Sequence, residues 1–146
     1  MISSDADVRI SYNCNGSLSV FPFSFPLIES SDIKVILRNK RTYTSTVLVE
    51  TTDYVVKNMS GAEGVDADFS NGGTVTTTIV YSSNYTLTLE RNVPYTQTRD
   101  FVEGSLTLYE NFESALDKLT MEIQQLKDKI GRSITIPSVD STSLNM

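Results

Sequence analysis

The stretch TVTTTIVYSSNYTLTLE, residues 74–90, alternates between apolar and polar side chains on both sides of a short polar break. This alternation is typical of strands that bury one face, and antiparallel sheets commonly have one solvated face. We therefore expect strands over Thr74–Tyr81 and Tyr85–Glu90, joined through Ser82–Asn84 into an antiparallel hairpin.

Similar short segments fill the N-terminal part of the chain. The expected strands are Val8–Tyr12, Ser17–Phe25, Ile33–Leu37, Thr42–Val49 and Asp53–Lys57. The Asn15-Gly16 pair is a strong hairpin signal and is expected to join the first two, and the fifth is a candidate partner for the fourth. Pro22 and Pro26 cannot donate to a ladder, so we expect Ser17–Phe25 to be an edge strand or to leave the sheet early. The predicted fold is mainly β, a small antiparallel sandwich or barrel.

The segment Asn58–Gly73 breaks this pattern, because it is rich in glycine and acidic residues. It is expected to form a surface loop. The spacing of Asp66 and Asp68 is similar to that of calcium loops, but the central glycine and the distal bidentate glutamate of that motif are absent. The sequence therefore predicts no metal site and no cofactor.

The hydrophobic period changes near residue 107, where Thr107 and Glu110 match a helix capping box. Apolar residues then follow at spacings of 4, 3, 4, 3 and 4: Phe112, Leu116, Leu119, Ile123, Leu126 and Ile130. This is a heptad seam with Leu116, Ile123 and Ile130 at position a and the others at d. We expect a helix over Leu108–Ile130, with Gly131 as its C′ residue.

The flanks of this seam are polar, whereas a helix that lays one face on a sheet usually has a wider apolar stripe. Glu122 at position g would face Lys127 at the next e position of a parallel neighbour, which is an attractive pair. Self-association is thus favoured over packing within the chain. Fewer than three full heptads are marginal alone, so the β domain must help hold the assembly. Isoleucine at a with leucine at d favours two strands in isolated coils.

Composition excludes several classes of function. The net charge of −6 disfavours binding to nucleic acid and to anionic membrane surfaces. The absence of histidine removes the usual general base and the commonest metal ligand. Cys14 has no second cysteine to pair with. Neither a signal peptide nor a membrane-spanning run is recognisable.

The order of several segments resembles the N-terminal virion-anchoring domain of tail fibres and tailspikes from short-tailed, T-seven-type phages. The shared features are the aromatic and proline segment Phe21–Pro26, the strand Asp32–Val35, Gly73–Val75, Arg91, Pro94, Gln97, Asp100-Phe101, Gly104-Ser105 and Ala115–Asp117. The resemblance spans about residues 8 to 140. Single pieces are weak signals, whereas their order and spacing together are fairly specific.

The resemblance implies a homotrimer in the virion, made in the bacterial cytoplasm and docked to the tail tube, the nozzle or a portal-proximal adaptor. It implies an anchoring domain over residues 1–104, a trimeric coiled coil over 105–131 and an attachment tail over 132–146. Candidate docking residues are Phe21, Phe23, Arg91, Gln97, Asp100 and Phe101. Family members commonly continue into a long shaft, so ending at Met146 favours a stand-alone adaptor that recruits a separate spike or fibre.

Two other functions compete with this structural one. A glycan-binding receptor module would present exposed aromatics, for which Tyr43, Tyr54, Tyr81 and Tyr109 are available; tyrosines more often line strand faces or cap a core. A glycoside hydrolase needs two carboxylates at set separations, and nothing in the spacing of the acidic residues singles out a pair. No catalytic activity is expected.

Overall fold

A computed structural model describes residues 8–64, 66–96 and 108–133 of the chain. The β part contains the strands β1 (Arg9–Asn13), β2 (Val20–Phe23), β3 (Ile33–Asn39), β4 (Ser45–Val47), β5 (Tyr54–Asn58), β6 (Gly73–Thr77) and β7 (Tyr85–Arg91). A short 3-10 helix, η1 (Ser30–Asp32), precedes β3, and the long helix α1 (Leu108–Gly131) follows the strands. The fold is therefore mainly β with one C-terminal helix, as predicted.

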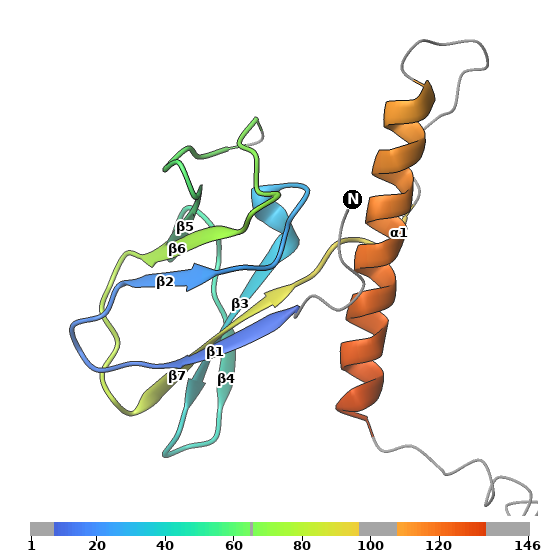
Figure 1. The fold of residues 1–146 in the computed structure, drawn as a ribbon. Helices are drawn as coiled ribbons and strands as arrows, with labels where there is room; N and C mark the ends of the chain where they lie inside the picture. The colour runs from blue at the N-terminus through green and yellow to red at the C-terminus, as the bar shows by residue number, and fades with distance from the viewer. Residues whose placement is uncertain (1–7, 65, 97–107, 134–146) are drawn as a thin grey trace, which may run out of the picture.

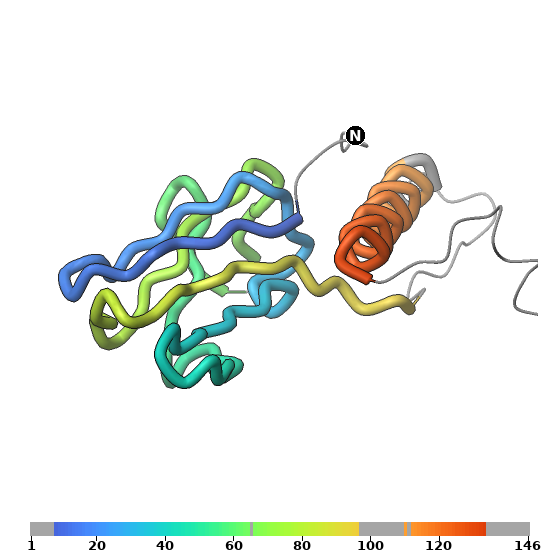
Figure 2. Tube along the Cα trace, turned by 90° about the horizontal axis from the view of Figure 1, so that it is seen from below, coloured from blue at the N-terminus to red at the C-terminus, as the bar shows by residue number. Residues whose placement is uncertain are grey.

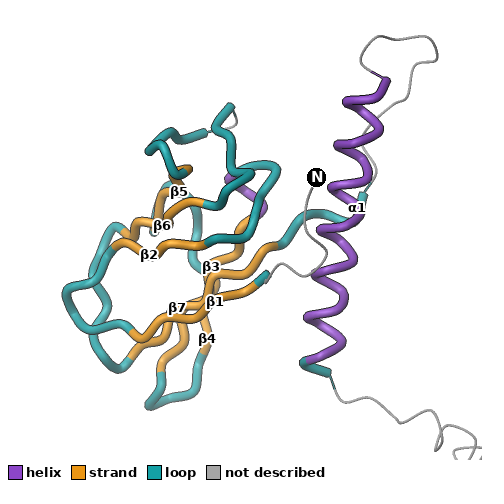
Figure 3. Tube along the Cα trace, in the orientation of Figure 1, coloured by secondary structure: helices purple, strands orange, loops and turns teal. Residues whose placement is uncertain are grey.

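The strands form two antiparallel sheets packed face to face (Figures 1 and 3). One sheet has the order β1-β7-β3-β4, and the other has the order β2-β6-β5. β7 lies between two neighbours, pairing with β1 from Arg9↔Glu90 to Asn13↔Thr86 and with β3 from Ile33↔Arg91 to Asn39↔Tyr85. β2 is an edge strand, as its prolines predict.

The expected strands are present, but three of their expected pairings are wrong. Asn15-Gly16 joins β1 to β2, which lie in different sheets, and the residues after β6 likewise lead into the other sheet. β5 pairs with β6, and only an isolated bridge, Glu50↔Tyr54, connects it with the region after β4. Alternation reports which face of a strand is buried, and both sheets bury one face here, so it does not identify the partner.

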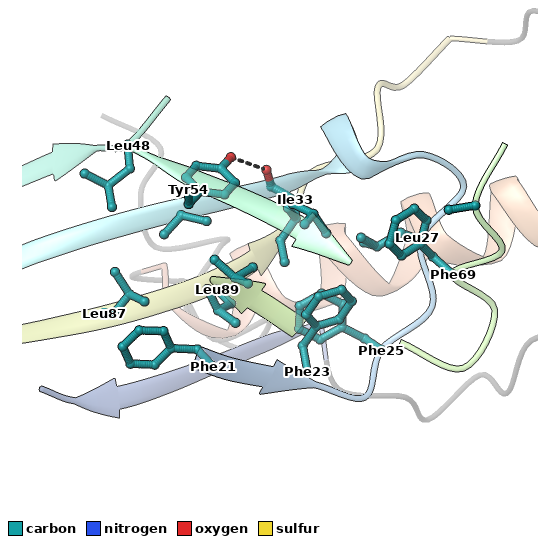
Figure 4. Close-up of a cluster of buried hydrophobic side chains, with 14 of the residues drawn as sticks. Phe21, Phe23, Phe25, Leu27, Ile33, Leu48, Tyr54, Phe69, Leu87 and Leu89 are labelled. Carbon is teal, nitrogen blue, oxygen red and sulfur yellow. Dashed lines mark hydrogen bonds between the residues drawn. The ribbon is translucent and has the colours of Figure 1, made fainter. Parts of the chain in front are cut away.

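Aromatic and aliphatic side chains fill the space between the sheets (Figure 4). The core includes Phe21, Phe23, Phe25, Leu27, Ile33, Val35, Tyr54, Phe69, Leu87 and Leu89. Phe69 comes from the segment expected to be a surface loop, and it is only 1% exposed. Its carbonyl accepts a hydrogen bond from the Leu27 N–H at 3.2 Å. This loop is thus partly core, because it carries an aromatic residue that the sheets bury.

Two adjacent glycines, the residue before β6 and its first residue, lie where the neighbouring backbones are too close for a side chain. A Cβ on Gly72, whose φ is +81°, would lie 2.2 Å from the Phe23 carbonyl oxygen. A Cβ on Gly73 would lie 2.1 Å from the Lys57 carbonyl oxygen. Only glycine fits at both positions.

The helix α1 lies beside the end of the sandwich where β1 begins and β7 ends (Figures 1 and 2). Its bounds agree with the predicted helix to within one residue. Gly131 is the last helical residue and does not have a positive φ, so its expected role as a left-handed C′ residue is wrong. Thr107, the expected N-cap, is outside the described residues.

Candidate functional site

The helix α1 packs on the β domain through its polar side. Among the helix residues whose side chains the structure describes, the buried ones are Met121, Gln124 and Gln125, at heptad positions f, b and c. These positions lie opposite a and d on a helix of 3.6 residues per turn. The face that contacts the chain's own sheets is therefore the reverse of the apolar seam.

The Gln125 side chain forms the centre of this contact. Its Oε1 accepts a hydrogen bond from the Val93 N–H at 2.7 Å, and its Nε2 donates to the Val93 carbonyl at 3.0 Å. The amide thus replaces the strand neighbour that Val93 would otherwise need just past the end of β7. Both residues are buried, and buried backbone groups need hydrogen-bond partners. The Gln125 side chain alone supplies a partner for both the N–H and the carbonyl of Val93.

Arg91, at the end of β7, is the second buried connection, with 1% of its surface exposed. Its guanidinium donates to the carbonyls of Pro26 at 3.3 Å and Met121 at 3.2 Å, and to the Gln124 side-chain oxygen. Burial lowers the pKa of Arg91 to about 10, which the nearby charge of Asp32 partly opposes. The guanidinium still carries its charge at neutral pH, and it connects the sheet to the helix backbone.

Polar contacts flank this buried centre along the helix. Towards its N-terminal half, Lys118 donates to the Thr96 carbonyl. Farther along, the Lys129 ammonium lies 5.0 Å from the centre of the Tyr95 ring, a cation–π contact. Both cations therefore hold the chain that leaves β7 against one side of α1.

The C-terminal end of α1 carries a small charge network. Arg132 lies 3.0 Å from Glu90 and 2.9 Å from Asp128, and Arg9 lies 3.7 Å from Asp128. Surface ion pairs contribute little each, but a network fixes orientation. The last turn of α1 is thus attached to β1 and β7.

The apolar seam faces away from the sheets and into solvent. Its six residues, Phe112, Leu116, Leu119, Ile123, Leu126 and Ile130, are each between 40% and 59% exposed. Single exposed apolar residues are normal, but a continuous row along a helix marks an interaction site. The seam predicted from sequence is therefore present as one exposed row of apolar side chains.

An apolar groove of about 250 Å³ adjoins one side of this seam. It is lined by Thr96, Phe112, Ala115, Leu116, Lys118, Leu119 and Glu122. Thr96 forms its outer wall, and the position g residues Ala115 and Glu122 lie on its helix side. The groove and the seam share Phe112, Leu116 and Leu119, so they form a continuous surface.

Three of the six candidate docking residues are buried in the described part of the chain. Phe21 and Phe23 are core residues, and Arg91 is occupied by the helix contact, so a tail partner would have to contact other side chains. Gln97, Asp100 and Phe101 are outside the described residues. Sequence reasoning missed the roles of Gln124 and Gln125, since polar residues opposite an apolar seam normally face water.

The glycan hypothesis gains little from the positions of the tyrosines. Tyr43 is 74% exposed, whereas Tyr54 is buried and Tyr81 packs against Tyr85 with ring centres 5.8 Å apart. The side chain of Tyr109 is outside the described residues. In the part of the chain that the structure describes, no three acidic or cysteine side chains gather as a metal site would require, and no helix is long and apolar enough to cross a membrane.

Comparison with known proteins gives one informative similarity. No protein-family model matches the chain. The chain is 31% identical over 129 residues to the tail spike protein of Salmonella phage epsilon15. The aligned region covers 87% of this chain and 11% of that protein. The chain therefore spans about a ninth of the length of the relative that it matches. This similarity indicates a phage tail protein and supports a structural role in the virion.

Proposed function

We propose that this chain is a non-catalytic anchoring domain that attaches a tail fibre or tailspike to the phage tail, and that it forms a homotrimer through α1. The observation that carries the proposal is the difference in burial between the two faces of α1. Its polar face is buried on its own β domain, and its heptad seam is exposed. A second copy of the same seam is the simplest surface that covers it.

The intramolecular contact strengthens this argument. A free helix with fewer than three heptads would associate weakly, but α1 is held by Gln125, Arg91 and the charge network around Asp128. The β domain therefore orders the helix before any partner binds, which lowers the entropy cost of association. Ordering by the β domain also compensates for the short seam.

Trimeric stoichiometry and the tail docking partner rest on the sequence resemblance. The partners we propose are the tail tube, the nozzle or a portal-proximal adaptor, with a separate spike or fibre at the C-terminal end. The match to a tail spike protein supports placing this chain in the phage tail.

The solution mass tests the association. We expect a trimer by light scattering for the native chain and a folded monomer for Leu119→Asp, because a carboxylate in a covered seam would lose its hydration. Met59→Asp is the matched control, since Met59 is also exposed and lies in the loop after β5, outside the seam. A native chain that stays monomeric at high concentration contradicts the proposal.

The anchoring role needs the virion. In a reconstruction of the tail, we expect three copies of the β domain against the tail tube or an adaptor, and the C-terminal end of α1 pointing towards the fibre or spike. Density for this chain at the host-facing tip alone would instead support the glycan-binding alternative.

A further inference from the structure

We propose that the groove beside α1 receives the opposite edge of the helix of the next copy, so that three parallel copies close into a ring. This inference rests on the proposed function, because it specifies how the seam is paired. The two edges of the seam are different. The groove is on the position g edge, whereas Thr120 and Lys127, on the position e edge, do not line it.

The wall of the groove comes from the chain leaving β7. Thr96 is fixed by the Lys118 side chain, and Tyr95 is fixed by the Lys129 ammonium. Both lysines lie on the side of α1 that faces away from position e. The g edge therefore carries a preformed concave surface that can receive side chains of a neighbouring helix.

Chemical complementarity supports this pairing. In a parallel coil, each g residue lies next to the e residue five positions later in the neighbour. Ala115 then meets Thr120 of the next copy, and two small side chains allow close approach. Glu122, which lines the groove, then meets Lys127, and within the described residues neither of these two has an ion-pair partner in its own chain.

The Thr120 hydroxyl is suited to an apolar contact, because it donates to the Leu116 carbonyl of its own helix at 2.9 Å. Its donor is thus satisfied before it enters a groove with Phe112 and Leu119 in its lining. An antiparallel arrangement would place groove against groove and Lys127 near Lys127. That arrangement leaves the apolar lining uncovered and brings like charges together.

The contact of one edge with the other is heterologous, and a heterologous contact forms a ring when the rotation between successive copies closes. In a ring of three, every groove and every e edge is used once. The attached β domains lie on the outer side of the three helices, since each helix uses positions b, c and f for its own domain.

Paired cysteines test both the register and the closure. In the full chain, Ala115→Cys with Thr120→Cys is treated with a short bifunctional maleimide and separated under denaturing conditions. Cys14 is buried and stays unmodified in the folded protein. We expect covalent trimers as the largest species, because each copy is linked to the next.

Two control variants separate the possible outcomes. Ala115→Cys with Glu122→Cys places both thiols on the g edge, and we expect no covalent trimers from it. Efficient cross-linking of this pair between copies, or covalent dimers alone from the first pair, overturns the ring. A trimer by light scattering that does not cross-link through the first pair overturns the groove contact while self-association stands. A native monomer contradicts the proposed function itself.

Discussion

The side-chain amide of Gln125 forms two hydrogen bonds with the backbone of Val93, one to its N–H and one to its carbonyl. A single helical residue thereby completes the strand edge that continues β7. Because both partners are buried, water has little access to replace either bond. The orientation of α1 about its own axis follows from this pair, and with it the direction in which the seam faces.

Removing this amide should loosen the helix from the sheets. Gln125→Ala leaves the buried N–H and carbonyl of Val93 without partners, which costs about 1–3 kcal/mol of unfolding free energy. Hydrogen exchange at the Val93 amide should accelerate strongly. The control is Met59→Ala, an exposed position outside the helix, which should stay within about 0.5 kcal/mol. Equal protection of Val93 in both variants would show that the amide does not hold the helix.

The Phe69 side chain should contribute as much to the free energy of unfolding as a buried strand residue does. Phe69→Ala is expected to cost about 3–5 kcal/mol in chemical denaturation, because it leaves a cavity between the sheets. Met59→Ala, in the same loop but 69% exposed, should change stability by less than about 0.5 kcal/mol. Similar effects of the two substitutions would indicate that the loop does not pack as a unit with the core.

Two glycines with nearly equal φ allow the stability cost of backbone strain to be measured separately from the cost of a steric clash. Gly61, with φ +84°, has open space around a built Cβ, and Gly61→Ala should cost about 1–2 kcal/mol from the left-handed backbone alone. Gly72→Ala has the same strain and an added clash with the Phe23 carbonyl, which should add about 1–3 kcal/mol. Thermal unfolding of both variants measures the difference, and equal melting temperatures would rule out the close approach of β2.

Tyr54 should make stability fall at alkaline pH. Burial raises its pKa from 10.0 to about 12, with smaller contributions from the charges of Glu50 and Asp53. Since the folded pKa is above the unfolded one, the stabilising effect is complete below pH 10 and is lost as pH rises through 12. Two pKa units correspond to roughly 3 kcal/mol. Tyr54→Phe should remove this dependence, so the difference in unfolding free energy between the two proteins should change between pH 10 and 12 and stay constant below pH 9.

Periodicity was sufficient to predict the strands and the helix, because burial of one face produces a repeat of 2.0 or 3.6 residues. It was insufficient for pairing. Asn15-Gly16 has the composition of a hairpin turn, yet its two strands diverge into different sheets, where the Tyr12 hydroxyl reaches the Pro22 carbonyl between them. A turn residue determines the local backbone, whereas the partner of a strand depends on distant segments.

The candidate site was predictable in part. The seam from Phe112 to Ile130 follows from spacing, and the structure exposes it as one row. The contact through Arg91 and Gln125 has no such signature, because hydrogen bonds from side chains to backbone depend on distance in space and not on sequence interval. The groove at Thr96 was likewise not predictable, since it depends on where the chain passes after β7.

The position of β7 between β1 and β3 has a mechanical consequence. The buried hydrogen bonds of α1 with the β domain are made at Arg91 and Val93, at the end of an interior strand, so tension applied to α1 reaches the sheet there. That strand is bonded on both sides, so the two ladders share the load and must yield together, whereas an edge strand would peel away one bond at a time. A pull on the helix is thereby distributed across the whole four-stranded sheet.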